Sequence, residues 1–156
     1  MSRERGVTFL ELIVTASILA ILASAILPLG RVTVKRQKEL ELRRSLRILR
    51  AAIDRHKLAV DRGEIGGTEI ETGNEGYPAD LEALVEGVSQ VGAADADARM
   101  KFLRRIPVDP MTGEADWGLR CYQDRPDSRS WCRDNVYDVY SRSDGVGLDG
   151  VPYREW

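Results

Sequence analysis

The feature that most constrains this chain is an apolar run over residues 7–30 that contains a single charged residue, Glu11. As an α-helix rising about 1.5 Å per residue, the run spans roughly 36 Å, which exceeds the roughly 30 Å hydrocarbon core of a bilayer. The apolar core of a secretory signal peptide is shorter, at about 7–15 residues. The run therefore predicts a retained single-pass membrane helix, with a cleaved signal peptide or a helix buried in a soluble core as the alternatives.

Glu11 is the anomaly within this run, because a carboxylate in a membrane helix is costly at the bilayer centre and less so near the interface. Two explanations fit the position of Glu11. The side chain either reaches the headgroup layer or has a partner of opposite charge inside the membrane.

The residues around Glu11 bear on that choice. Gly6 ends a short polar leader, the apolar run follows it, Glu11 is the fifth residue after Gly6, and Pro28 is the twenty-second. This arrangement resembles the processing site of the type IV pilin superfamily. The resemblance implies cleavage between Gly6 and Val7 by a prepilin peptidase, and N-methylation of Val7. Pro28 lacks a backbone N–H, which predicts a kink or a melted turn there.

The resemblance also implies a role for Glu11 in assembly. In a filament, the Glu11 carboxylate of one subunit would pair with the new Val7 amine of its neighbour, which offsets the desolvation of a lone buried charge. The chain is then expected to form a homo-oligomeric filament, with Glu11 setting the register between subunits.

Charge is distributed unevenly along the chain. The net charge of the protein is only −2, yet the lysines and arginines outnumber the acids in residues 31–62 and the acids dominate residues 63–156. Opposite charges on two segments predict that the segments meet, within one molecule or between copies. The basic face could also bind nucleic acid or anionic lipid, but we expect a solvated or subunit-facing surface and no nucleic-acid partner.

The flanks of the apolar run give a conflicting prediction of topology. The run is preceded by Arg3 and Arg5 and followed by a denser basic cluster, so the positive-inside rule places the C-terminal side in the cytoplasm. The type IV pilin resemblance implies the opposite orientation, and we adopt it because three matched offsets support it. The basic cluster that follows the apolar run consists of Arg31, Lys35, Arg36 and Lys38.

Residues 31–62 are predicted to continue the helix. Apolar residues recur there at alternating steps of four and three, which places them on one face. After this helix, the sequence predicts a glycine-rich loop over residues 63–76 and a short helix over 80–85 that is stopped by Gly87. A linker at 91–98 and a helical turn at 99–106 are predicted next. Three antiparallel strands are predicted at residues 117–122, 136–141 and 151–156. The residues on one face of the helix over 31–62, which we call the apolar stripe, are Leu42, Leu46, Leu49, Ile53, His56 and Val60.

These elements predict an α+β fold, with a long N-terminal helix whose second half packs against a small C-terminal antiparallel sheet of about three strands. The expected organisation is a cleaved leader at residues 1–6, a transmembrane and assembly helix at 7–30, an amphipathic continuation at 31–62 and a globular head at 63–156.

Three stretches of the head extend the resemblance. "YPADLEALV", "RRIPVDPMTG" and "NVYDVYSRSDG" are similar to stretches, in the same order, of the major pseudopilin of type II secretion systems. This implies a periplasmic filament for protein transport, anchored in the bacterial inner membrane with its head in the periplasm. The implied partners are minor pseudopilins, prepilin peptidase and the inner-membrane assembly platform. A type IV pilus subunit and a monomeric membrane-anchored binding module remain alternatives.

Two groups in the head are candidate bonding sites. Cys121 and Cys132 lie in or beside one loop, and outside the cytoplasm a disulfide between them is expected, with free thiols as the alternative. Ser143, Asp144 and Asp149 offer hard oxygen donors in a glycine-rich loop, which suits calcium. The pseudopilin resemblance implies calcium in this region too, and an ordinary turn is the alternative.

No catalytic constellation is present in the sequence. It has no nucleophile motif or phosphate-binding loop, and its only histidine, His56, falls in the apolar stripe, where a packed or hydrogen-bonded histidine is expected. We therefore predict a structural protein, not an enzyme, with no cofactor other than calcium.

Overall fold

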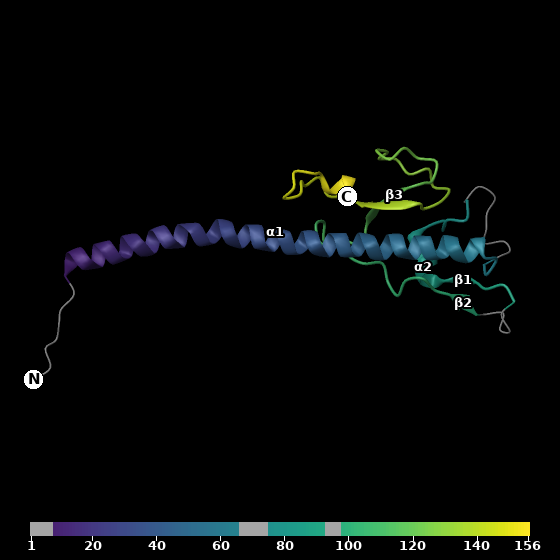
Figure 1. Cartoon of the computed structure of the whole chain (residues 1–156), viewed down its shortest axis with the longest axis horizontal. Helices are drawn as coiled ribbons and strands as arrows, with labels where there is room; N and C mark the ends of the chain where they lie inside the picture. The colour runs from purple at the N-terminus through teal and green to yellow at the C-terminus, as the bar shows by residue number, and fades with distance from the viewer. Residues whose placement is uncertain (1–7, 66–74, 93–97) are drawn as a thin grey trace, which may run out of the picture. The chain divides into compact units, whose positions relative to one another are not determined.

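A computed structural model of the chain describes residues 8–65, 75–92 and 98–156, and the side chains of residues 25–29 lie outside this description. The chain divides into two compact units, with the boundary between Gln37 and Lys38. The helix α1, Phe9–Asp61, contributes to both units (Figure 1).

The two ends of α1 have clear local causes. The backbone N–H of Glu11 donates to Thr8 Oγ1 at 3.3 Å, so Thr8 caps the first turn. At the other end Gly63 adopts a φ of 69°, and the N–H groups of Gly63 and Glu64 return to the carbonyls of Val60 and Ala59, both at 2.9 Å. This pair of bonds is a Schellman motif, for which glycine is favoured. The prediction that the helix ends at Gly63 is confirmed.

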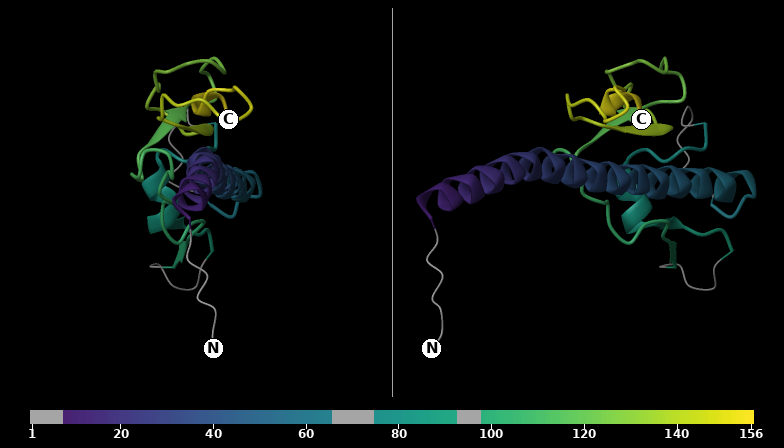
Figure 2. Two further views of the ribbon diagram at one scale, coloured as in Figure 1. Left: turned by 90° about the vertical axis from the view of Figure 1, so that its left-hand side faces the viewer. Right: turned by 60° about the vertical axis from the view of Figure 1, so that its left-hand side comes forward.

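The second half of α1 forms the core of the head. The predicted stripe is buried as expected from Leu42 to His56, with Leu42, Leu49 and Ile53 fully buried, and its last member, Val60, is partly buried. Two small sheets flank this half of the helix on opposite sides (Figures 1 and 2). The α+β prediction, with the second half of the helix packed against the head, is confirmed. The core also contains Leu84 and Val88 near one sheet and Trp117, Val136 and Val139 near the other.

The head differs from the prediction in its number of sheets and in the number of strands in each. The head contains two two-stranded antiparallel sheets, not one of three strands. In the larger sheet, β3 (Trp117–Arg120) pairs with β4 (Asp138–Ser141). These two strands were predicted, with each about two residues shorter than expected. In the smaller sheet, β1 (Val88–Ser89) pairs with β2 (Arg99–Met100).

The prediction of a helical turn at residues 99–106 is wrong. The chain is extended at β2, and the N–H groups of Phe102 and Leu103 both donate to Leu84 O, at 3.0 and 2.8 Å. Leu84 lies in the helix α2, Leu81–Glu86, whose last carbonyls have no partner inside the helix. An extended segment satisfies this carbonyl in a way that a separate helical turn would not. The short helix itself was predicted, and it begins after the N-cap Asp80 and ends at Gly87.

The predicted third strand at residues 151–156 is also wrong. Only a single bridge forms there, between Val146 and Pro152, and the chain then turns into the 3₁₀-helix η1, Tyr153–Glu155. Side chains at i and i+3 share one face of a 3₁₀-helix, whereas in a strand they point to opposite faces. The turn therefore places Tyr153 and Trp156 together, with ring centroids 5.1 Å apart, so that both can face α1.

Candidate functional site

The first half of α1 exposes a large apolar surface. Most of its large side chains are at least half exposed, and they surround the helix instead of following one face. Such a surface requires lipid or other protein to cover it. Over the residues that the structure describes, no helix combines the length and the apolar character required to cross a membrane. The exposed residues include Phe9, Leu10, Leu12, Ile13, Val14, Ile18, Leu19, Ile21 and Leu22.

Glu11 lies in the first turn of this half, and its side chain is exposed. A carboxylate is favourable at a helix N-terminus, because it faces the positive end of the macrodipole. Thr8 and Glu11 also have the spacing of a capping box, and one of the two bonds of that motif is present. Gly6 and Val7, the predicted processing site, lie outside the described residues.

The hydroxyl groups of this half are bonded to the helix itself. Thr15 Oγ1 donates to Glu11 O at 2.9 Å, Ser17 Oγ to Ile13 O at 2.8 Å, and Ser24 Oγ to Ile21 O at 2.7 Å. Each donor is thus satisfied locally and needs no water, which suits a helix surrounded by apolar groups.

Pro28 falls where the side chains are not described. The helix is assigned without interruption from Phe9 to Asp61, and the kink at Pro28 stays a prediction.

A second carboxylate on the same helix, Glu39, was missed by the sequence reasoning. It is buried, and its Oε1 accepts hydrogen bonds from Leu148 N at 2.8 Å and from the Tyr153 hydroxyl at 3.0 Å. Burial and the bond to Glu39 raise the pKa of Tyr153 to about 12. A signal for Glu39 existed, because it precedes Leu42 by three positions and so extends the apolar stripe by one member.

Ion pairs join the basic part of α1 to the acidic head, as the charge distribution predicted. Arg50 Nε lies 2.7 Å from Asp138 Oδ1, and the same guanidinium donates to the carbonyls of Val139 and Trp156. Arg120 of β3 contacts the other oxygen of Asp138 at 3.3 Å. Asp138 therefore connects the larger sheet to the helix at a partly buried position, where an ion pair is stronger than at the open surface.

The candidate calcium residues have different surroundings. Asp149 Oδ2 forms a salt bridge with Arg43 at 3.1 Å, and its Oδ1 accepts a bond from Val151 N at 3.1 Å. Ser143 Oγ accepts a bond from Gly145 N at 3.2 Å. Asp144 is exposed and lines a cavity together with Arg129, Arg142 and Arg154. A cation at Asp149 would therefore have to compete with the Arg43 guanidinium.

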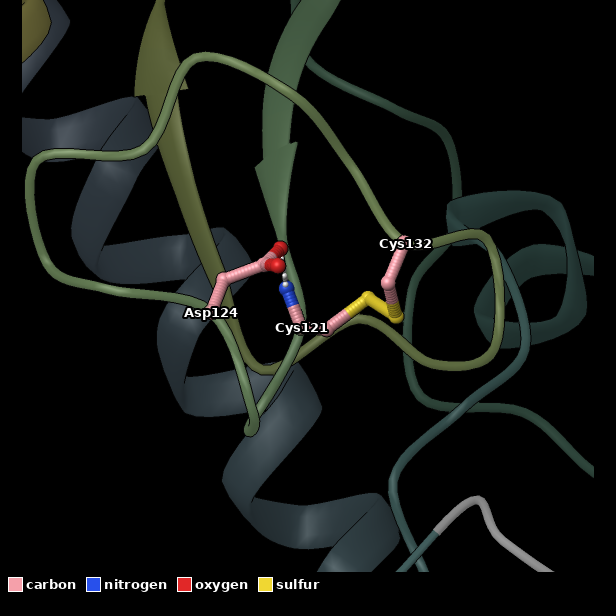
Figure 3. A group of neighbouring side chains, drawn as sticks. All are labelled: Cys121, Asp124 and Cys132. Carbon is pink, nitrogen blue, oxygen red and sulfur yellow. Dashed lines mark hydrogen bonds between the residues drawn. A yellow bond between two sulfur atoms is a disulfide. The ribbon is translucent and has the colours of Figure 1, made fainter.

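Cys121 and Cys132 form a disulfide that closes the loop after β3 (Figure 3). The carboxylate of Asp124 points toward Cys121 and accepts a bond from its backbone N–H at 2.8 Å (Figure 3). Of the residues with described positions, only these three form a group of potential metal ligands lying within 4.8 Å of one another. The two sulfurs are bonded to each other, so they are not thiolate ligands in this structure.

His56 is packed and hydrogen-bonded, as expected. It is buried, its Nδ1 lies 3.2 Å from Gly76 O, and its ring contacts Phe102 edge-on with centroids 5.3 Å apart. Its position in the core explains its place in the stripe without any ligand.

Residues 1–27 match the family described as the prokaryotic N-terminal methylation motif. This motif is typical of type IV pilin-like, membrane-anchored proteins, which undergo processing by a prepilin peptidase and assemble into filaments. No curated protein matches the chain, and neither does any solved structure.

Proposed function

We propose that this chain is a structural subunit of a type II secretion pseudopilus, a periplasmic filament that drives protein export. The observation that carries the proposal is the methylation motif at residues 1–27, which includes most of a helix half whose apolar side chains are exposed on all sides. A monomeric binding module has no need of this combination of a processing signal and an uncovered helix.

In the proposed filament, the first half of α1 packs against the same segment of other subunits. Cleavage after Gly6 creates an amine at Val7, which becomes N-methylated. That amine is a counter-charge for the exposed Glu11 of a neighbouring subunit. Pairing removes the desolvation cost of burying either charge alone, so the pair sets the register of the filament.

The proposed surroundings follow from the same family relationship. The chain crosses the bacterial inner membrane once and holds its head in the periplasm, where the Cys121–Cys132 disulfide is stable. It acts with prepilin peptidase, minor pseudopilins and an inner-membrane assembly platform, and it has no enzymatic activity of its own.

A type IV pilus subunit is the second candidate, because the methylation motif is common to type IV pilin-like proteins. The head stretches "YPADLEALV" and "RRIPVDPMTG" favour the secretion subunit. Deletion of the gene separates the two functions: a secretion subunit is required for export of a folded protein, and a pilus subunit for adhesion, motility or DNA uptake.

Processing and assembly are tested together by the native N-terminus and by a substitution at Glu11. Mass spectrometry of the membrane-extracted chain is expected to find a methylated Val7 terminus. Glu11→Ala is expected to leave cleavage intact and to block incorporation into filaments, and Glu11→Gln to do the same because the charge is lost. Glu41→Ala, which removes an exposed carboxylate further along α1, serves as the control. Normal filaments from Glu11→Ala would refute the pairing.

We also propose that calcium binds the loop over residues 141–149, through Asp144, Asp149 and the Ser143 hydroxyl. Asp149 is engaged by Arg43, which makes the competition measurable. Calcium is expected to raise the melting temperature of the full chain in detergent, and Arg43→Gln is expected to increase the calcium affinity by releasing Asp149. Equal melting in calcium and in chelator, for both proteins, would show that the loop is a plain turn.

A further inference from the structure

Two cavities adjoin on the larger sheet of the head. One, of about 400 Å³, lies between the disulfide-closed loop, β4 and the segment that follows β4. The other, of about 500 Å³, lies between the same loop and the C-terminal segment. Both are lined by Arg129, Tyr140 and Arg154, so they meet at these three residues. We call the two together the arginine cavity.

The charge of the arginine cavity contrasts with that of the head around it. Acids outnumber bases in residues 63–156, yet in the lining of this one surface four arginines outnumber three carboxylates. Arg120 is paired with Asp138 and Arg142 with Asp116, at 3.3 and 2.8 Å. Within the described part of the chain, the side chains of Arg129 and Arg154 have no ion-pair or hydrogen-bond partner. The four arginines are Arg120, Arg129, Arg142 and Arg154.

Arg154 is the more informative of the two, because it is only partly exposed. A guanidinium that gives up part of its hydration without gaining an acidic partner is unfavourable. The cost is offset when an anion binds, since guanidinium groups form charge-assisted, bidentate bonds to carboxylate and phosphate. The free arginines therefore define one part of a ligand: an anionic oxygen group.

The floor of the cavity is held in place before any ligand binds. The Tyr140 ring lies across Gly118 of β3, where a Cβ would come within 2.2 Å of the ring. The Arg120 guanidinium lies 4.2 Å from the centroid of the same ring. On the loop side, Trp131 Nε1 donates to Asn135 O at 2.7 Å. A preorganised surface of this kind loses little freedom on binding.

The remaining lining defines the rest of the ligand. Leu119 and Trp131 provide apolar walls. Acceptors for hydroxyl donors come from the Ser143 hydroxyl and from the three carboxylates of the lining, Asp127, Asp144 and Glu155. A ligand that suits the free arginines, the acceptors and the apolar walls carries an acid group, several hydroxyls and a small apolar face. Cavities of this size accommodate small molecules.

We infer that the arginine cavity binds a small acidic carbohydrate, a sugar acid or a sugar phosphate, with its acid group held by Arg129 and Arg154. This binding is independent of filament assembly, because every residue concerned lies in the head.

Calorimetric titration of the full chain in detergent micelles tests the inference, with glucuronate and glucose 6-phosphate as probes. At least one of them is expected to bind, and glucose and inorganic phosphate to bind about tenfold more weakly or not at all, because each lacks one part of the ligand. Binding is expected to weaken as salt concentration rises.

Substitutions locate the site. Arg129→Gln and Arg154→Gln are each expected to weaken binding by about tenfold or more, the range for a hydrogen bond to a charged group. Arg104→Gln, which removes an exposed arginine that lines neither cavity, is the matched control. Arg129 is exposed, so its variant is expected to fold normally even if Arg154→Gln does not. Absence of binding at millimolar probe, equal binding of inorganic phosphate, or an equal loss with Arg104→Gln would each overturn the inference.

Discussion

The two halves of α1 share one continuous backbone helix but differ in how their apolar residues are arranged. In the first half, apolar side chains surround the helix and are exposed, as Leu19 is at 66%. In the second half they follow one stripe and are buried, as Leu49 is at 0%. The head covers the second half within the molecule, whereas the apolar side chains of the first half stay exposed in the single chain. The same secondary structure thus serves two different kinds of contact.

The largest expected effect is the difference in head stability between two variants, each with one leucine truncated in a different half of α1. Leu49→Ala is expected to destabilise the head by about 2–5 kcal/mol, because it leaves a cavity in a fully packed core. Leu19→Ala is expected to leave the melting temperature of the head unchanged and to affect assembly alone. Thermal unfolding of both full-length variants in detergent measures the difference, and equal losses would mean that the halves do not differ as described.

The disulfide is a contribution to stability that lies wholly in the head. Replacing Cys121 and Cys132 together by serine is expected to lower the stability of the head by about 2–4 kcal/mol. Reductant is expected to lower the melting temperature of the native protein to a similar degree and to leave the variant unaffected. A native protein that melts at the same temperature with and without reductant would contradict the stabilising role.

Two carboxylates on α1 sharpen the comparison, because one is buried and one is exposed. Glu39→Ala removes the acceptor of Leu148 N and of the Tyr153 hydroxyl, and is expected to cost about 1–3 kcal/mol of head stability. Glu39→Gln keeps a carbonyl acceptor and is expected to recover part of this loss. Glu41→Ala, two residues along on the exposed face, is expected to change the stability little, and a loss equal to that of Glu39→Ala would refute the buried role.

The smallest expected effect is a dependence of stability on alkaline pH. Since the pKa of Tyr153 is raised from 10.0 to about 12, the folded state favours the protonated phenol. This contribution is fully present below about pH 10 and is lost as the pH rises through 12. Tyr153→Phe is expected to flatten the loss over this window, whereas Tyr137→Phe, at an exposed position, is expected to retain it. Identical pH profiles for all three proteins would argue against the bond to Glu39.

Periodicity predicted the helix, its end and its buried stripe, because these depend on local spacing and on single residues such as Gly63. Glu39 was missed since a carboxylate is not expected in an apolar stripe, although its spacing was correct. The segment at residues 151–156 has the composition of a strand, yet Tyr153 and Trp156 both face the helix, which only a tighter turn allows. Its conformation is decided by partners more than a hundred residues away, and no local pattern contains that information.

The dependence of the stripe on distant partners has a consequence during synthesis. Val60 leaves the ribosome about ninety residues before Tyr153, which at roughly 5–20 residues per second is an interval of about 5–20 s. For most of this time Leu42, Leu49 and Ile53 lack the larger sheet, because its last strand, β4, ends only at Ser141. The nascent helix is then an amphipathic segment with basic flanks, attached to an apolar one. The cell must keep this uncovered face from other nascent chains until the last residues of the head arrive.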